Sequence, residues 1–204
     1  MNKNFFTTLL VAFATISFAS CDRDDDDNRQ QPRRGGVIIN GVEWARSNVA
    51  APGTFAQNPE NAGMFYQWNR RQGWAATGGI TGWDNRPATG TEWERTNNPC
   101  PEGWRIPTQS EFHSLAGAGS EWITQNGVNG RLFGTYPHQI FLPAVGWRRG
   151  SDGRLEGAGS SADYWSSTQL NNENAVRLGF GRVGIVVIVA GLRTNGLPIR
   201  CVAE

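Results

Sequence analysis

Short apolar segments separated by turn residues follow one another from residue 37 to the end of the chain. Residues 37–44 (VIINGVEW) predict two short strands around Asn40-Gly41, because an Asn-Gly pair readily adopts the positive φ values of a tight hairpin turn. The segment 184–190 (GIVVIVA) lacks polar alternation, which predicts a strand with both faces covered. The other strands are predicted at 140–147, 164–168, 175–180 and 198–202.

One α-helix is predicted in the middle of the chain. Thr108 has the N-cap position and Glu111 follows three residues later, which is the capping-box arrangement. Phe112 and Leu115 form the apolar side of this helix, and two nearby glycines end it. A second short helix is expected at 120–125.

The least regular part of the domain is residues 72–100, which are rich in Gly, Thr and Asn. We predict one long excursion of loops there, and long loops in a compact domain are commonly functional. The preceding aromatic segment, 63–71 (GMFYQWNRR), suits either a strand or a short helix.

The first twenty residues have the layout of an export signal. Lys3 supplies the positive start, residues 5–18 form an apolar run too short to span a bilayer, and Ala19-Ser20 precede Cys21. A cysteine after small residues matches a lipobox, although Phe18 stands where Leu is usual. We therefore predict a lipoprotein signal peptide at 1–20 and lipidation of Cys21, which ties the protein to a membrane. A plain secreted protein with a free Cys21 is the alternative.

Residues 21–36 (CDRDDDDNRQQPRRGG) contain no large apolar side chain that could enter a core. This composition predicts a disordered acidic tether. A block of aspartates directly after a lipidated cysteine resembles the export tag of Bacteroidetes lipoproteins, which implies an outer-membrane, surface-exposed location. The alternative is a linker that only solvates.

Residues 37–204 have the length of one domain with its own core. They carry 14 Arg, no Lys and 13 acidic residues, and this near-zero net charge argues against a nucleic-acid partner. All nine Trp and most of the Gly also lie here. This composition predicts loops pinned by aromatic rings, with arginines stacked on those rings.

The three cysteines divide into Cys21 and a remaining pair, Cys100 and Cys201. If Cys21 is acylated, the oxidising cell envelope favours a disulfide within the pair. A catalytic thiol or a metal ligand is the alternative. His113 and His138 lie in no ligand-spaced motif with these cysteines, so no metal site is predicted.

Several phrases of the sequence belong together. They are 40–45 (NGVEWA) with Asn48-Val49, 63–68 (GMFYQW), 98–108 (NPCPEGWRIPT), 142–146 (LPAVG), 164–168 (YWSST) and 193–202, ending in RCV. This set resembles the Fibrobacter succinogenes major paralogous domain of Bacteroidetes surface lipoproteins, over nearly all of residues 37–202. Three of the motif tryptophans are expected in the core: Trp44, Trp104 and Trp165.

The resemblance implies an α+β, C-type-lectin-like fold related to formylglycine-generating enzymes. Such a domain has twisted antiparallel sheets, one or two short helices, long loops and chain ends brought together. It would place Cys100 and Cys201 as a structural pair joining the segment before the helix to the last strand. The family implies no known reaction.

Catalytic chemistry finds little support in the residues. An enzyme of the formylglycine-generating type needs a reactive cysteine pair, and Cys100 with Cys201 is the only candidate. Ser166 and Ser167 lie in a strand-like segment and not in a nucleophile elbow. No spacing singles out a carboxylate pair, and Trp83-Asp84-Asn85 has the wrong order for a calcium-lectin motif. No catalytic residue, metal or cofactor is predicted.

Binding has more support, because three tryptophans and several polar residues share the loops. Aromatic faces beside hydrogen-bonding groups suit sugar rings or a protein partner. We therefore predict a non-catalytic binding or adhesion domain for a glycan or a protein. The alternatives are an enzyme of the formylglycine-generating type and a structural subunit of a surface appendage or complex. For the rings themselves, the alternative is that they form a small core under the loops. The predicted ligand-binding residues are Trp74, Trp83, Asp84, Asn85, Arg86 and Trp93.

Overall fold

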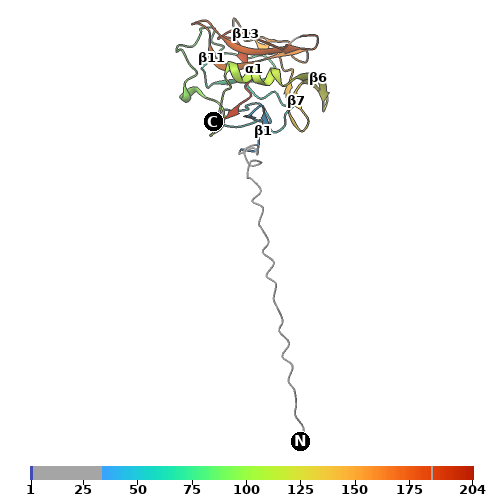
Figure 1. Ribbon diagram of the computed structural model, residues 1–204. Coiled ribbons are helices and arrows are strands. Elements are labelled where there is room, and N and C mark those ends of the chain that lie inside the picture. Colours follow the sequence, from blue (N-terminus) through green and yellow to red (C-terminus); the bar gives the residue numbers. More distant parts are fainter. Residues whose placement is uncertain (2–33, 185) are drawn as a thin grey trace.

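The computed structural model describes Met1, residues 34–184 and residues 186–204 (Figure 1). The predicted signal peptide beyond Met1, Cys21 and the tether as far as residue 33 lie outside the described residues. The described chain is an α+β domain dominated by antiparallel sheets, with one α-helix among the described residues.

The first sheet brings the two ends of the domain together, in the order β1-β2-β15-β5. Ile39 pairs with Val42 around the predicted turn, where Asn40 and Gly41 have φ values of 49° and 80°. This confirms the hairpin. Figure 1 shows the start of the domain and its C-terminal end on the same side. The strands are β1 (Val37–Ile39), β2 (Val42–Trp44), β5 (Trp104–Arg105) and β15 (Val202–Ala203).

The second sheet, in the order β10-β9-β14-β3-β4, is assembled from very short strands. The predicted strand at 140–147 is divided, because the chain leaves one sheet at Pro143 and enters this one at Trp147. The predicted strand at 198–202 is likewise replaced by β14 and β15, in two sheets. The strands are β3 (Phe65–Gln67), β4 (Gly73–Trp74), β9 (Trp147–Arg148), β10 (Leu155–Glu156) and β14 (Gly196–Leu197).

Two three-stranded meanders complete the sheets. One contains β6 (Ser120–Gln125), β7 (Val128–Thr135) and β8 (His138–Pro143). The predicted second helix at 120–125 is therefore wrong. Asn126-Gly127 forms a second tight turn, with φ values of 49° and 81°, and this turn folds β6 back onto β7.

The other meander contains β11 (Ser161–Gln169), β12 (Asn174–Gly181) and β13 (Val187–Leu192). β13 is its edge strand, and Val189 and Leu192 are 41% and 51% exposed. The prediction that both faces of this segment are covered is thus wrong. An unbroken apolar run does not by itself show that its side chains are buried. In β13 part of the apolar surface faces solvent.

Helix α1 (Gln109–Gly117) begins as predicted. Thr108 accepts a hydrogen bond from the backbone N–H of Glu111, and the Glu111 side chain accepts one from the backbone N–H of Thr108. Phe112 and Leu115 are fully buried, and Phe112 stacks on Trp44 at a ring distance of 5.7 Å. Figure 1 shows the helix beside the β11–β13 sheet, which it contacts.

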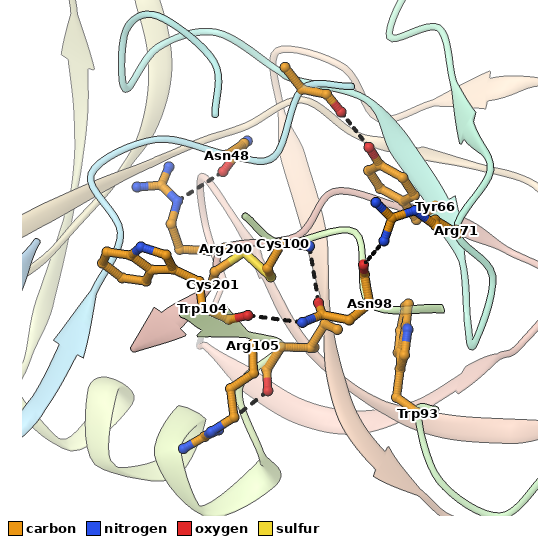
Figure 2. Close-up of a disulfide and its surroundings, with 12 residues drawn as sticks. Asn48, Tyr66, Arg71, Trp93, Asn98, Cys100, Trp104, Arg105, Arg200 and Cys201 are labelled. Atoms are coloured by element: carbon orange, nitrogen blue, oxygen red, sulfur yellow. Dashed lines mark hydrogen bonds between the residues drawn. A yellow bond between two sulfur atoms is a disulfide. The ribbon is translucent and has the colours of Figure 1, made fainter. Parts of the chain in front are cut away.

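The residues around Phe112 and Trp44 form one hydrophobic core, and a second core surrounds the disulfide between Cys100 and Cys201 (Figure 2). The pairing predicted for these two cysteines is confirmed. The three motif tryptophans are buried as expected: Trp44 is 0% exposed, Trp104 6% and Trp165 0%. The disulfide and the β5–β15 pairing together hold the segment before the helix to the end of the chain.

The last residues assigned to the tether contact the domain. The backbone N–H groups of Arg34 and Gly36 donate to Glu43 Oε1 at 2.8 and 3.0 Å, and Arg46 Nε donates to the carbonyl of Gly35 at 2.9 Å. These bonds fix the direction in which the chain enters β1.

Candidate functional site

The predicted loop region is irregular, as expected, with β4 and the short 3-10 helix η2 (Arg95–Asn97) as its regular elements among the described residues. Two buried arginines from other parts of the sequence, Arg148 and Arg193, form hydrogen bonds with its backbone carbonyls. Arg148 donates to the carbonyls of Ala75, Thr77 and Gly78 at 2.8, 3.2 and 3.1 Å. These carbonyls have no partner strand, and the buried Arg148 guanidinium satisfies them instead.

Arg193 holds the later part of the same region. It donates to the carbonyls of Thr89 and Gly90 at 3.3 and 3.0 Å, and its guanidinium lies 4.0 Å from the ring centre of Trp68. This confirms the expectation that arginines stack on the aromatic rings. Burial lowers the pKa of Arg193.

Trp74 and Trp83 form a pair of contacting rings, of which Trp74 is buried and Trp83, like Trp93, is half-buried. Their ring centres are 4.9 Å apart, and Trp74 is only 8% exposed. Trp83 Nε1 donates to the carbonyl of Gly150 at 2.9 Å. Its ring also covers Gly196, where a Cβ atom would come within 2.7 Å of it. These two rings therefore build the small core under the loops that the sequence left open as an alternative.

Asp84 follows this pair and is occupied by ion pairs. Its carboxylate accepts from Arg86 at 3.0 Å and from Arg70 at 2.8 Å. These bonds, led by that from Arg86, hold the pKa of Asp84 well below its ordinary value. The Arg86 side chain is 83% exposed and Asn85 is also exposed, so both remain accessible at the loop surface.

Trp93 lies in a different environment from the other two loop tryptophans. It is half-buried and packs edge-on against Trp68, with ring centres 5.6 Å apart. Its Nε1 donates to the carbonyl of Asn97 at 3.0 Å. The ring borders a pocket of about 270 Å³, and the lining residues are Trp93, Arg95, Asn98, Arg105, Ile106, Thr108, Ser167 and Glu204.

Asn69 positions the chain around Trp93. It is 4% exposed and has a left-handed backbone with a φ of 54°, which asparagine tolerates well. Its Oδ1 accepts from the backbone N–H of Glu94 at 2.8 Å and from Asn97 Nδ2 at 3.2 Å, and its Nδ2 donates to the carbonyl of Thr89 at 3.0 Å. One buried amide thus joins both sides of the Trp93 loop.

The pocket is also tied to the disulfide through Asn98 (Figure 2). Asn98 Nδ2 donates to the carbonyl of Trp104 at 2.9 Å, and its Oδ1 accepts from the backbone N–H of Cys100 at 3.0 Å. Arg71 donates to the Asn98 carbonyl at 2.6 Å. This wall is therefore ordered before any ligand binds.

The charges around the pocket are unevenly committed. Arg105 forms two hydrogen bonds with Glu111, at 2.9 and 2.6 Å. Burial by itself raises the pKa of Glu111, but the bonds from Arg105 and Thr108 outweigh it and hold that pKa below the ordinary value. Arg95 has no ion pair with any described residue, and no hydrogen bond within the described chain occupies the Glu204 side chain.

The predicted ligand-binding residues include Trp93 but not Arg95, Arg105, Ser167 or Glu204. These residues come from η2, β5, β11 and the chain end, and only the tertiary fold brings them together. The signal available in the sequence was the set of family-like motifs: residues 98–108 and 164–168 supply most of the pocket wall.

A larger hollow, of about 390 Å³, lies beside the β1–β2 turn and includes His138 and Asn40 in its lining. Its lining contains no Phe, Tyr or Trp. We therefore take the smaller Trp93 pocket as the candidate site, since it joins a predicted loop tryptophan to uncommitted polar groups.

Among the described residues, the serines of the 164–168 motif and the possible metal ligands give little support for nucleophilic or metal chemistry. Ser166 is fully buried and its Oγ accepts from the backbone N–H of Thr168 at 3.1 Å, while Ser167 Oγ donates to the carbonyl of Pro107 at 3.3 Å. Within residues 34–184 and 186–204, no three His, Cys, Asp or Glu side chains are grouped so as to hold a metal ion. Across the same residues, the structure contains no helix with the length and apolar character of a membrane span.

No protein-family model matches the chain, and neither a curated protein nor a solved structure matches it.

Proposed function

We propose that the chain is a cell-surface lipoprotein whose domain binds an extracellular ligand, a glycan or a protein, without catalysing a reaction. The observation that carries this proposal is the Trp93 pocket, an aromatic ring beside a hollow of about 270 Å³. Asn98 and Arg105 in its wall are already held by internal hydrogen bonds. A wall ordered in advance reduces the entropy lost on binding.

The finer fold assignment is part of this proposal. We assign the domain to the C-type-lectin-like fold and to the major paralogous domain family. Three features support the assignment: the paired ends of the domain, the long loops at residues 72–100, and the disulfide between the segment before α1 and the end of the chain. The resemblance implied each of them.

The membrane anchor is supported by the cysteine pairing. Because Cys100 and Cys201 are joined, Cys21 is the remaining cysteine of the sequence. We propose that it carries the lipid and that the acidic segment behind it directs the protein to the outer face of the outer membrane. Mass analysis of the mature N-terminus should find an acylated Cys21, and protease added to intact cells should cleave the domain. An unmodified Cys21 would refute the anchor.

An enzyme of the formylglycine-generating type is less well supported, because its chemistry needs two reactive thiols and both cysteines are bonded to each other. A thiol assay on the folded, unreduced protein tests this alternative: free Cys100 and Cys201 would revive it.

A structural subunit is the second candidate function, and the edge strand β13 favours it. Val189 and Leu192 are exposed on an edge whose sequence contains neither charge nor proline, and such edges can pair with another chain. Size-exclusion chromatography of the full chain in detergent distinguishes the candidates, since strict monomers count against self-assembly.

The binding proposal is tested with the full-length chain in detergent on an array that carries both glycans and extracellular matrix proteins. We expect binding to at least one ligand, lost in Trp93→Ala, largely kept in Trp93→Phe and unchanged in Glu92→Gln, an exposed neighbour in the same loop. A folded protein that binds nothing on the array, or whose binding ignores Trp93→Ala, would overturn the proposal.

A further inference from the structure

We infer that the Trp93 pocket takes one uncharged sugar ring. This inference rests on the proposed function, because it names the ligand class of the same pocket. A hollow of about 270 Å³ is slightly smaller than the ~300–1,000 Å³ typical of small-molecule sites, so it suits one ring and not an extended oligomer.

The aromatic wall supplies an apolar surface with no polar group of its own to satisfy. The indole N–H of Trp93 is bonded to the carbonyl of Asn97, and Trp68 packs against the ring from the protein side. Arg193 lies against Trp68 in turn, at 4.0 Å. Trp68 thus supports Trp93, and the part of the Trp93 side chain that lines the pocket is an apolar surface suited to the C–H groups of a pyranose.

The charges of the rim select against ionic ligands. The guanidinium of Arg105 is 2.6 Å from the carboxylate of Glu111, so these two charges balance. The other side-chain charges in the lining, on Arg95 and Glu204, are opposite in sign, and Glu204 also attracts the Arg105 guanidinium. A phosphate, sulfate or carboxylate would meet Glu204, and an ammonium group would meet Arg95, so neither kind of ion finds a surplus of opposite charge.

Hydroxyl groups match the same rim. A guanidinium only donates hydrogen bonds and a carboxylate only accepts them, whereas a sugar hydroxyl does both. Ser167 Oγ donates to the carbonyl of Pro107 and keeps its lone pairs free to accept. Neighbouring hydroxyls of one ring can therefore bond Arg95, Glu204 and Ser167 together, whereas a carboxylate only accepts and an ammonium group only donates.

The test uses full-length protein in detergent and measures binding by saturation-transfer NMR and calorimetry. The probes are methyl glucoside, methyl galactoside, methyl mannoside and methyl N-acetylglucosaminide, with methyl glucuronide and glucose 6-phosphate as charged counterparts. The variants are Arg95→Gln, Glu204→Gln and Trp93→Phe, and Glu92→Gln is the exposed control that removes the same charge as Glu204→Gln.

We expect at least one neutral glycoside to bind, with affinity about tenfold lower in Arg95→Gln and in Glu204→Gln and unchanged in Glu92→Gln. The charged sugars should bind more weakly than their neutral counterparts. Tighter binding of glucuronide or sugar phosphate, strengthened by Glu204→Gln, would overturn the inference and leave the pocket as a binding site. The inference would also be overturned, with the pocket kept as a binding site, if an array ligand depended on Trp93 but none of the sugars bound. Failure of the proposed function differs, since no array ligand would then depend on Trp93.

Discussion

Three arginines in this domain, Arg148, Arg193 and Arg200, are at most 1% exposed, and none of them forms an ion pair with a carboxylate among the described residues. Their hydrogen bonds go almost entirely to backbone carbonyls. A guanidinium has five donors in a planar fork, so one side chain can satisfy carbonyls from several irregular segments at once. This explains why these three buried positions hold arginine and not lysine.

Arg200 makes the most central of these contacts. It donates to Asn48 Oδ1 at 3.0 Å and to the carbonyls of Ala45, Arg46 and Phe141 at 3.2, 2.6 and 3.0 Å (Figure 2 shows the Asn48 bond). Burial lowers the pKa of Arg200 to about 10, and the group stays charged at neutral pH.

We predict that Arg200→Lys lowers the free energy of unfolding by about 3 kcal/mol or more. Lysine keeps the charge but cannot reach four separated acceptors, and each buried carbonyl left unpaired costs about 1–3 kcal/mol. Urea unfolding at neutral pH measures the change. Arg182→Lys is the matched control, because Arg182 is exposed. Equal stability of the two variants would show that the buried contacts contribute little.

At the scale of single elements, helix α1 depends on one carboxylate. Glu111 closes the capping box with Thr108 and also binds Arg105 of β5. Its pKa in the folded domain lies below the ordinary value of 4.5. The ionised side chain therefore stabilises the folded state above pH 4.5, and this contribution is lost as the pH falls through the lower folded pKa.

We predict that Glu111→Gln lowers the free energy of unfolding by about 1–2 kcal/mol at pH 7. The difference from the unsubstituted protein should shrink as the pH falls from 4.5 through the lower folded pKa of Glu111, below which both proteins carry a neutral side chain at this position. Urea titrations between pH 7 and pH 3 provide the measurement. Glu121→Gln, at an exposed position of β6, removes the same charge and is the control; it should leave the free energy of unfolding at pH 7 nearly unchanged. A gap that widens in acid would contradict the assigned role.

The elements that were predictable are those whose signal is local. The Asn40-Gly41 turn and the Thr108–Glu111 capping box are each contained within a few residues, and both were found. The second sheet was not predictable, since β9, β14 and β4 have two residues each and exist only through pairing with distant strands. The error at 120–125 had a local remedy, because Asn126-Gly127 carries the same turn signal as Asn40-Gly41.

The candidate site shows the same limit. Trp93 was identified from its place in a loop, because aromatic residues in polar loops need an explanation. Trp93 lines the pocket, whereas Trp74 and Trp83 pack against each other. This difference arises from tertiary contacts, which the positions of the three residues in the sequence do not predict. Arg95 and Glu204 are 109 positions apart (204 − 95) and share a pocket only after β15 has paired with β5.

At the scale of the whole molecule, the disulfide joins the segment before α1 to the last strand across a sequence separation of 101. Cys100 and Cys201 are 6% and 0% exposed. The same bond lies beside the candidate site, since the backbone N–H of Cys100 donates to Asn98 in the pocket wall. Stability and binding should therefore respond together when the bond is removed.

We predict that the double variant Cys100→Ser, Cys201→Ser lowers the free energy of unfolding by about 4–5 kcal/mol, because a loop of about 100 residues is no longer closed in the unfolded chain. The denaturant midpoint measures the loss, and Cys21→Ser, outside the described domain, is the control. Where the double variant still folds, its affinity for any array ligand that depends on Trp93 should also fall. Without the disulfide, the backbone N–H of residue 100 that donates to Asn98 is no longer held in place. A loss under about 1 kcal/mol would mean that the β5–β15 pairing alone holds the ends together, and unchanged affinity would separate the pocket from the disulfide.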